Sequence, residues 1–102
     1  MRRSQSCYSP VVRFEWDPEK AAANLTKHGV SFDEASAVFG DPLATTVEDR
    51  EHSTSEERLL TTGLSSRQRV VIVWHTDRDD TVRIVGAREA TPRERRIYES
   101  GQ

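Results

Sequence analysis

The sequence predicts a single α+β domain with two N-terminal helices, an antiparallel β-meander sheet and a C-terminal helix. Signals for the start of a helix occur near both ends of the 102-residue chain, and strand-like segments joined by short polar connections lie between them. Such connections are typical of a meander, and helices segregated from an antiparallel sheet define the α+β class. A chain of this length has room for one core, so we expect residues 13–102 to form one domain. Residues 1–12 lack periodicity and are predicted to be a flexible extension.

The first patterned segments predict a short strand and a helix. Residues 14–16 alternate apolar and polar side chains, which is typical of a strand. Asp17 then offers an N-cap oxygen, and Pro18 stands at the first helical position, where its missing N–H is not needed. Gly29 is predicted to end this helix, because glycine tolerates the left-handed conformation of a helix C-cap.

A second helix is predicted directly after this glycine. Ser31 and Glu34 have the spacing of a capping box, in which the Glu34 carboxylate reaches back to the N–H of the cap residue. We expect this helix to run through Val38 and to end near Gly40.

The middle of the chain is rich in strand signals. The run R-V-V-I-V-W-H, from Arg69 to His75, contains mostly β-branched and aromatic residues and is expected in the middle of the sheet. Polar residues predict a loop over residues 49–57 and turns over residues 65–68 and 76–80. The four strands predicted in this part of the chain cover residues 43–47, 58–64, 69–75 and 81–87.

The last predicted helix begins with a second capping box. Thr91 is the cap residue, Pro92 stands at the first helical position and Glu94 at the third. The helix is expected to run to about Tyr98.

The formal net charge of −2 conceals an uneven distribution of charge. Residues 14–57 carry three basic and eleven acidic side chains, whereas residues 58–102 carry nine basic and six acidic ones. Five arginines but only two glutamates lie between Arg83 and Arg96, both included. Indiscriminate binding of polyanions is therefore not expected, but a local cationic pocket is compatible with this composition.

Several cationic side chains have the chemistry that cleavage of RNA requires. Transesterification at phosphorus needs a base for the 2′-OH proton, an acid for the departing 5′-oxygen and cations for the phosphorane. Arginine binds two phosphate oxygens at once, and histidine titrates near neutrality. The catalytic candidates are Lys27, His28, Arg58, Arg83, Arg88 and Tyr98, and the RNA-binding candidates are Arg93 and Arg96.

These residues also have structural interpretations. An arginine at a strand end is more often a solvated surface charge, and Lys27 and His28 both complement the dipole at a helix C-terminus. Glu94 is expected to cap its helix rather than to act as a general base. Trp16 and Trp74 are expected in the core, although either could stack on a base if it were exposed.

The spacing of two arginines needs an irregular strand. Arg83 and Arg88 are five residues apart and would face opposite sides of a regular strand. Gly86 lies between them, and a bulge at this glycine would bring both side chains to one face. We predict that bulge.

Other chemistries are not expected. His28, His52 and His75 lack the spacing of metal ligands, and a single cysteine, Cys7, excludes a cysteine-based zinc site. The sequence has no phosphate-binding glycine loop and no evident nucleophile triad. We predict no metal and no cofactor. Without a membrane-spanning apolar run or a secretory signal, we expect a cytoplasmic protein with no membrane partner.

Four ordered motifs over roughly residues 13–99 resemble the BrnT family. They are F-E-W-D-P-E-K-A-x-x-N-x-x-K-H-G-V-S-F-D-E-A from Phe14, D-P at 41–42, H-S-x-x-E-E-R ending at Arg58, and R-I-V-G-A-R-E-A-T-P-R-E-R-R-x-Y ending at Tyr98. The resemblance implies a RelE-like fold and the toxin of a type II toxin–antitoxin pair. The catalytic candidates Lys27, His28, Arg58, Arg83 and Arg88 lie in these family-typical segments.

The resemblance also implies an activity and partners. The activity would be that of an endoribonuclease that inhibits translation, with RNA as its substrate. The partner would be a BrnA-type antitoxin with a ribbon-helix-helix domain, in an assembly such as a 2:2 heterotetramer. Operator DNA would be contacted only through the antitoxin.

Two function classes follow for this chain. In the first, a metal-independent endoribonuclease cleaves RNA by 2′-OH transesterification. Arg83 and Arg88 clamp the phosphate, and Arg58 assists them. Either His28 or Lys27 transfers the protons. Tyr98 is a further candidate for the catalytic set. In the second, a non-catalytic module binds the antitoxin and acts in autoregulation of the operon. A direct DNA-binding role ranks last, because no basic recognition helix with a helix-turn-helix partner is evident.

Overall fold

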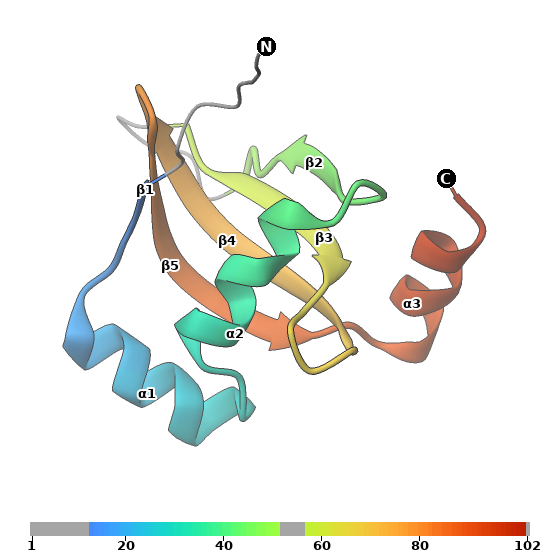
Figure 1. The fold of residues 1–102 in the computed structure, drawn as a ribbon, viewed down its shortest axis with the longest axis horizontal. Helices are drawn as coiled ribbons and strands as arrows, with labels where there is room; N and C mark the ends of the chain where they lie inside the picture. The colour runs from blue at the N-terminus through green and yellow to red at the C-terminus, as the bar shows by residue number, and fades with distance from the viewer. Residues whose placement is uncertain (1–12, 52–56, 102) are drawn as a thin grey trace, which may run out of the picture.

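The computed structural model describes residues 13–51 and 57–101. The predicted extension over residues 1–12 and most of the predicted loop over residues 49–57 lie outside these ranges. The elements follow one another in the order strand, two α-helices, a short 3₁₀ helix, four strands and an α-helix (Figure 1). They are β1 (Arg13–Glu15), α1 (Pro18–His28), α2 (Phe32–Ser36), the 3₁₀ helix η1 (Ala37–Gly40), β2 (Thr45–Glu48), β3 (Leu59–Leu64), β4 (Val70–Arg78), β5 (Thr81–Glu89) and α3 (Pro92–Glu99).

The five strands form one mixed sheet in the order β1-β5-β4-β3-β2. The predicted meander from β2 to β5 is confirmed, with every neighbouring pair antiparallel. The expectation of a wholly antiparallel sheet is wrong, because β1 runs parallel to β5 and pairs Arg13 with Thr81 and Glu15 with Arg83. Three alternating residues indicate a strand, but they carry no information about its direction or its partner.

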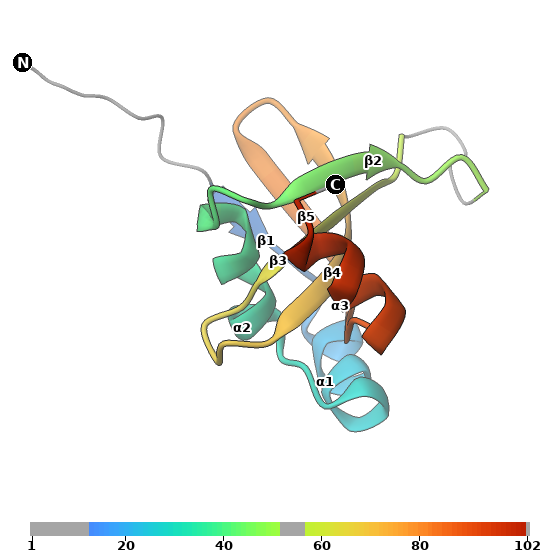
Figure 2. The same ribbon diagram turned by 90° about the vertical axis from the view of Figure 1, so that its right-hand side faces the viewer.

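The sheet has a helix on each of its faces (Figure 2). The α2 face carries the larger core, in which Phe32 and Val38 pack on Val71, Val73 and their neighbours from β4 and β5. The α3 face carries a smaller cluster of Val70, Ile72 and Ala90, and partly buried residues such as Leu60, Trp74 and Tyr98 pack against it. The α3 face is therefore thinly covered, and it is the face on which hollows can form.

Both predicted ends of α1 are confirmed. The Asp17 carboxylate accepts a hydrogen bond from the Glu19 N–H at 2.9 Å, and Pro18 occupies the first turn. Gly29 takes the left-handed conformation with φ 71° and donates its N–H to the Leu25 carbonyl. Lys27 and His28 consequently sit in the last turn, as expected.

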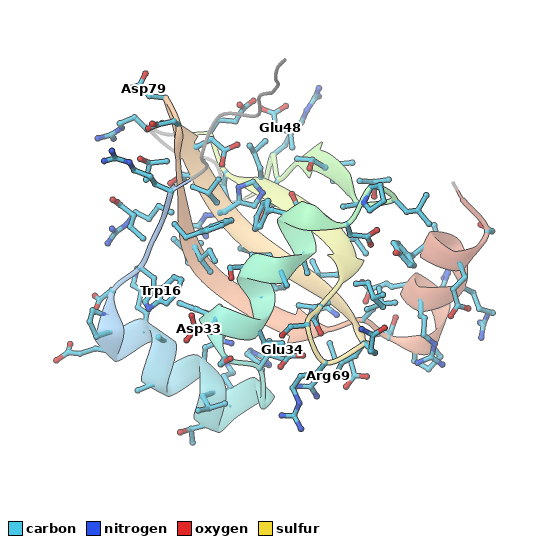
Figure 3. All side chains as sticks on the ribbon, viewed as in Figure 1. Trp16, Asp33, Glu34, Glu48, Arg69 and Asp79 are labelled. Atoms are coloured by element: carbon cyan, nitrogen blue, oxygen red, sulfur yellow. The ribbon has the colours of Figure 1, made fainter. Side chains whose placement is uncertain are left out.

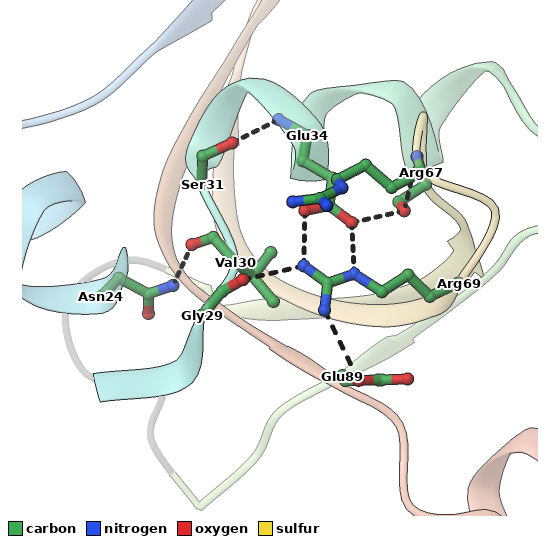
Figure 4. Close-up of polar contacts among 9 residues, drawn as sticks. Asn24, Gly29, Val30, Ser31, Glu34, Arg67, Arg69 and Glu89 are labelled. Atoms are coloured by element: carbon green, nitrogen blue, oxygen red, sulfur yellow. Dashed lines mark hydrogen bonds and ion pairs between the residues drawn. The ribbon is translucent and has the colours of Figure 1, made fainter. Parts of the chain in front are cut away.

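The capping box predicted for the second helix forms only in part. Ser31 Oγ accepts from the Glu34 N–H at 3.0 Å, but the Glu34 side chain turns away from the cap. Figure 3 shows Glu34 and Arg69 pointing toward each other, and Figure 4 shows the bonds between them. Arg69 donates to both Glu34 oxygens, at 2.7 and 2.8 Å, and Ser65 donates to one of them. Two charge-assisted bonds to a guanidinium outweigh one bond to a backbone N–H.

The second helix is also shorter than predicted. It is α-helical only to Ser36 and continues as the 3₁₀ helix η1 to Gly40. This tighter segment passes close over Gly63 of β3, where an added Cβ would lie 2.9 Å from Val38 Cγ1 and 3.0 Å from Ala44 Cβ. Gly63 thus permits a close approach that any other residue would obstruct.

The predicted strand boundaries need correction at the β4–β5 hairpin. Strand β4 continues to Arg78 and β5 runs to Glu89, so the turn predicted over residues 76–80 shrinks to Asp79 and Asp80. Asp79 adopts φ 55°, a conformation that aspartate tolerates better than most residues. Because the turn is only two residues long, β4 and β5 remain paired as far as Arg78 and Thr81, directly beside it.

The last helix matches its prediction closely. Thr91 Oγ1 accepts from the Glu94 N–H at 3.2 Å, and Glu94 Oε1 accepts from the Thr91 N–H at 2.8 Å, so both halves of the capping box form. Helix α3 then ends at Glu99. Among the helices of the described ranges, none has the length and apolar character needed to cross a membrane.

Candidate active site on the α3 face

A bulge in β5 brings the two widely spaced arginines to one face of the sheet. Trp74 pairs with Gly86, but the next residue, His75, pairs with Ile84, so Val85 is the extra residue of the bulge. The predicted bulge beside Gly86 is therefore confirmed. Arg83 and Arg88 both belong to the α3 face, separated by about 13 Å of strand at about 3.3 Å per residue.

A hollow of about 530 Å³ lies between α1 and this face of the sheet. Among the residues that the structure describes, its lining holds four groups that are or can become cationic, Lys20, Lys27, His28 and Arg58, and no acidic side chain. The hollow is therefore suited to an anion. We call it the cationic pocket, and the described residues that line it are Lys20, Ala23, Asn24, Lys27, His28, Arg58, Trp74, Val85, Gly86 and Ala87.

The helical repeat of α1 gathers its side chains on this pocket. Lys20, Asn24 and Lys27 follow one another at spacings of four and three residues, which places them on one face of the helix. Helix α1 ends immediately afterwards at Gly29, so Lys27 and His28 lie at its C-terminal edge.

Asn24 fixes α1 against the sheet and was missed by the sequence reasoning. Its side-chain N–H₂ donates to the carbonyls of Val30 and Ala87, both at 2.9 Å, and its oxygen accepts from the Ala87 N–H at 3.2 Å. Ala87 directly follows Gly86 of the bulge. Two signals in the sequence could have found it: Asn24 is a fixed position of the first BrnT-like motif, and it shares a helical face with Lys20 and Lys27.

Arg88 is held beside the pocket by a carboxylate. Its two terminal nitrogens donate to Glu94 Oε1 and Oε2 at 2.8 and 2.9 Å, and its guanidinium lies 5.4 Å from the centre of the Trp74 ring. This pairing raises the pKa of Arg88 and, with the Thr91 N–H, lowers the pKa of Glu94 to about 2 against the opposing effect of burial. A phosphate would have to compete with Glu94 for this arginine.

Tyr98 anchors α3 instead of standing free in a site. Its hydroxyl donates to Asp41, and the same carboxylate accepts from the N–H groups of Leu43 and Leu64. The hydrogen bond to Asp41 and burial raise the pKa of Tyr98 to about 12, so the phenol is protonated at neutral pH.

A second hollow, of about 230 Å³, lies under α3 and shares Trp74 with the cationic pocket. Its lining is mostly apolar or hydroxylic but includes Arg88 and Glu94. We call it the apolar hollow, and it is lined by Thr45, Val47, Leu60, Thr62, Ile72, Trp74, Arg88, Glu94, Ile97 and Tyr98.

Arg83 lines a different hollow. This one measures about 400 Å³ and lies toward the β4–β5 turn, with Asp79 and Asp80 in its lining. Arg83 donates to Glu15 at 2.9 Å, and both side chains are about half exposed. The structure therefore groups Lys27, His28 and Arg58 in one pocket, sets Arg88 and Tyr98 in the adjoining hollow and keeps Arg83 apart from both. The clamp of Arg83 with Arg88 stays a prediction.

The remaining candidates lie on α3. Arg93 and Arg96 are exposed on this helix and line none of the three hollows. Their proposed contact with RNA stays a prediction. In residues 13–51 and 57–101, no group of three or more histidine, cysteine, aspartate or glutamate side chains could hold a metal ion.

The architecture has a counterpart among solved structures. The fold is similar to that of the Brucella abortus ribonuclease toxin BrnT, with a TM-score of 0.61 and 18% sequence identity over 79% of this chain and 99% of that chain. A search of curated proteins gives no match.

The family model of BrnT, the ribonuclease toxin of a type II toxin–antitoxin system, matches residues 16–94. The chain belongs to this family. It is accordingly a ribonuclease toxin of a type II toxin–antitoxin system, with RNA as its substrate and an antitoxin as its partner. The match includes α1 and the strands that line the cationic pocket.

Proposed function

We propose that the protein is a metal-independent endoribonuclease that cleaves RNA by 2′-OH transesterification in the cationic pocket and so inhibits translation. The observation that carries this proposal is the convergence of Lys27, His28 and Arg58 in a pocket whose described lining contains no acidic side chain. Fixed cations aimed at a developing charge are the usual means of stabilising a phosphorane. In such a pocket these side chains can supply that charge without a metal ion.

Each step of the reaction has a candidate group in the pocket. His28 or Lys27 takes the proton of the 2′-OH, whose oxygen attacks phosphorus, and the other returns a proton to the departing 5′-oxygen. The bond from phosphorus to that oxygen breaks, which leaves a 2′,3′-cyclic phosphate and a 5′-OH. Arg58 binds the non-bridging oxygens as their charge grows. Tyr98 is assigned no proton transfer, because its pKa of about 12 and its bond to Asp41 suit it to anchoring α3.

The wider context of the reaction is proposed from the family. We expect the fold to be RelE-like in detail. We also expect a BrnA-type antitoxin with a ribbon-helix-helix domain, assembled with the toxin as a 2:2 complex that contacts operator DNA through the antitoxin. The strongly acidic charge of residues 14–57 supports a basic protein partner, since opposite charges steer association. The alternative, a non-catalytic module that binds the antitoxin and regulates the operon, predicts the same partner but no cleavage.

The proposed chemistry is tested by the ends of the RNA fragments. Purified protein should cut single-stranded RNA in the presence of EDTA and leave 2′,3′-cyclic phosphate and 5′-OH ends, detected by mass spectrometry. RNA methylated at every 2′-oxygen should remain intact. Loss of cleavage in EDTA, or fragments with 5′-phosphate ends, would contradict transesterification without metal. A pure protein that binds antitoxin but cuts no RNA would favour the non-catalytic alternative.

A further inference from the structure

Trp74 forms a wall between two hollows of different chemistry. It lines the cationic pocket on the side of α1 and the apolar hollow on the side of α3. Its side chain is only partly buried, although it packs against the cluster of Val70 and Ile72. An aromatic ring in such a place adjoins an anion site and an apolar site at once.

The neighbours of Trp74 leave its ring accessible from the cationic pocket. Its cross-strand partners are Leu60 on β3 and Gly86 on β5. An added Cβ at Gly86 would lie 3.7 Å from Trp74 Cε3 and 3.9 Å from Asn24 Oδ1, so a side chain there would fill the space between the indole and α1. The glycine of the bulge thus keeps the cationic pocket open up to the indole.

The apolar hollow has the size and chemistry of a site for one flat ring. Its volume of about 230 Å³ is below the roughly 300–1,000 Å³ of sites that enclose drug-sized ligands. Leu60, Ile72 and Trp74 supply apolar surface, and Thr45 and Thr62 add hydroxyl groups to the lining. Unstacked RNA bases are recognised by this combination of aromatic stacking and hydrogen bonds to the base edge.

We propose that the apolar hollow binds a nucleobase of the substrate RNA, stacked on Trp74, next to the phosphate that occupies the cationic pocket. This inference rests on the proposed function, because it takes that pocket to hold RNA. Arg88 lies over the Trp74 ring, 5.4 Å from its centre, and is bound to Glu94, so it adds a guanidinium to the border of this hollow. Trp74 is then a binding residue that orients the nucleotide and takes no part in proton transfer.

An apolar side chain of the antitoxin is the other occupant that the hollow could accept. Ile97 and Val47 at its edge are about half exposed, as they would be at a protein interface. The base is favoured over the antitoxin side chain because the two hollows share Trp74. A base bound in the apolar hollow would keep its phosphate beside the pocket that Lys27 and Arg58 line. The two occupants give different results in the following test.

The test compares two uncleavable probes that carry equal charge. One is a single-stranded oligonucleotide methylated at every 2′-oxygen, and the other is a chain of abasic linkers with the same number of phosphates. Wild type should bind the first about 5- to 150-fold more tightly, which is the range expected for stacking of one base on an aromatic side chain. Trp74→Leu should bind both probes equally, and Trp74→Phe should retain most of the preference.

Tryptophan fluorescence gives a second readout, because the chain has only two tryptophans. Trp16 packs edge-on against Phe32 in the core of the α2 face. In Trp16→Phe the remaining emission comes from Trp74, and the base-bearing probe should quench it while the abasic probe should not. Circular dichroism shows whether each variant is folded.

The outcomes separate this inference from the proposed function. Equal binding of both probes by wild type, or an unchanged preference in folded Trp74→Leu, would overturn the base site. Weaker antitoxin binding by Trp74→Leu with unaffected RNA binding would assign the hollow to the protein partner and would also overturn it. Lys27→Ala should weaken both probes alike. If Lys27→Ala changes the affinity for neither probe, the proposal that the cationic pocket binds phosphate is wrong, whatever the result for Trp74.

Discussion

At the scale of single residues, the side chain that does most to shape the site carries no charge. Asn24 bonds to Val30 and to both backbone groups of Ala87, and so joins α1, the segment after Gly29 and the strand after the bulge. These bonds hold Lys27 and His28 at the edge of the cationic pocket. Asn24 is a positioning residue in this account, because it acts through its neighbours.

Asn24→Asp should therefore damage both stability and cleavage. The new carboxylate oxygen would face the Val30 and Ala87 carbonyls, which lose their donor. We expect the free energy of unfolding in urea to fall by roughly 1–3 kcal/mol or more. The rate of RNA cleavage, measured under conditions in which the variant is folded, should also fall. Thr26→Ala, an exposed change on α1, is the control, and an Asn24→Asp protein as stable and active as that control would contradict the positioning role.

Tyr98→Phe tests whether the tyrosine is an anchor or a catalyst. Its hydroxyl donates to Asp41, and with a pKa of about 12 it cannot serve as a base at neutral pH. We expect the free energy of unfolding to fall by roughly 1.5–3 kcal/mol, the range for a hydrogen bond to a charged group. The cleavage rate of the folded protein should change little. A large loss of rate in a variant of normal stability would return Tyr98 to the catalytic set.

Residue-level predictions from sequence succeeded where the interaction was local. Asp17, Gly29 and Thr91 act within a few residues of themselves, and each was placed correctly. The Glu34 side chain was misassigned, since its partner Arg69 lies 35 residues away. Nothing in the local pattern shows which distant group competes for a side chain.

At the scale of elements, the approach of η1 to β3 depends on one glycine. Gly63 is buried, and a Cβ at this position would lie 2.9 Å from Val38 and 3.2 Å from Asp41 Oδ2. Either η1 or the strand must move to admit a methyl group.

Gly63→Ala should accordingly destabilise the fold by about 1–3 kcal/mol, as overpacked core positions do. The free energy of unfolding in urea measures this loss. Gly40→Ala is the matched control, because a Cβ there meets nothing within 4 Å. If the two alanine variants unfold at the same urea concentration, the close approach does not constrain the fold.

The elements also show how far sequence patterns reach. The helices and the meander were predicted in the right order, because capping residues and β-branched runs are local signals. The parallel pairing of β1 with β5 was not, since a three-residue strand at the sheet edge takes its direction from the helices that follow it. The bulge was predicted from Gly86 and from the odd spacing of Arg83 and Arg88, which would face opposite sides of a regular strand. The register of β5 confirms it.

At the scale of the whole molecule, three carboxylates make stability depend on acid pH. Hydrogen bonds from Arg69 lower the pKa of Glu34, and Arg88 lowers that of Glu94 to about 2. Burial tends to raise the pKa of Asp41, but the bonds from Tyr98 and two N–H groups outweigh it. A lowered pKa in the folded state stabilises the protein above the unfolded value, and that stabilisation is lost as pH falls through the folded value.

The free energy of unfolding should thus decrease between about pH 4.5 and pH 2. The upper limit is the ordinary pKa of a glutamate, 4.5, and the lower limit is that of folded Glu94. Glu57 beside Glu48 has a raised pKa and acts in the opposite direction. Urea unfolding at a series of pH values measures the slope, which Glu94→Gln should make shallower. An equally steep slope in that variant would show that the Arg88 pairing does not contribute.

The distribution of charge over the whole molecule supports the cationic pocket as the site of RNA cleavage. The chain is acidic overall, but the described residues that line the cationic pocket include four that are or can become cationic and none that is acidic. The family to which the chain belongs consists of ribonuclease toxins. Sequence alone indicates the candidate cations, but only the fold shows that α1 and the residue before β3 bring Lys27, His28 and Arg58 together. The pocket is therefore where cleavage should be sought.

The most direct measurement is the single-turnover rate of RNA cleavage by Arg58→Ala in EDTA. The loss of one group that stabilises the transition-state charge should lower the rate about 10²- to 10³-fold, while Arg58→Lys keeps part of it. Arg50→Ala, which removes a surface arginine paired with Glu48 outside the pocket, should cleave at the wild-type rate. If folded Arg58→Ala cleaves as fast as Arg50→Ala, the cationic pocket is not the catalytic site.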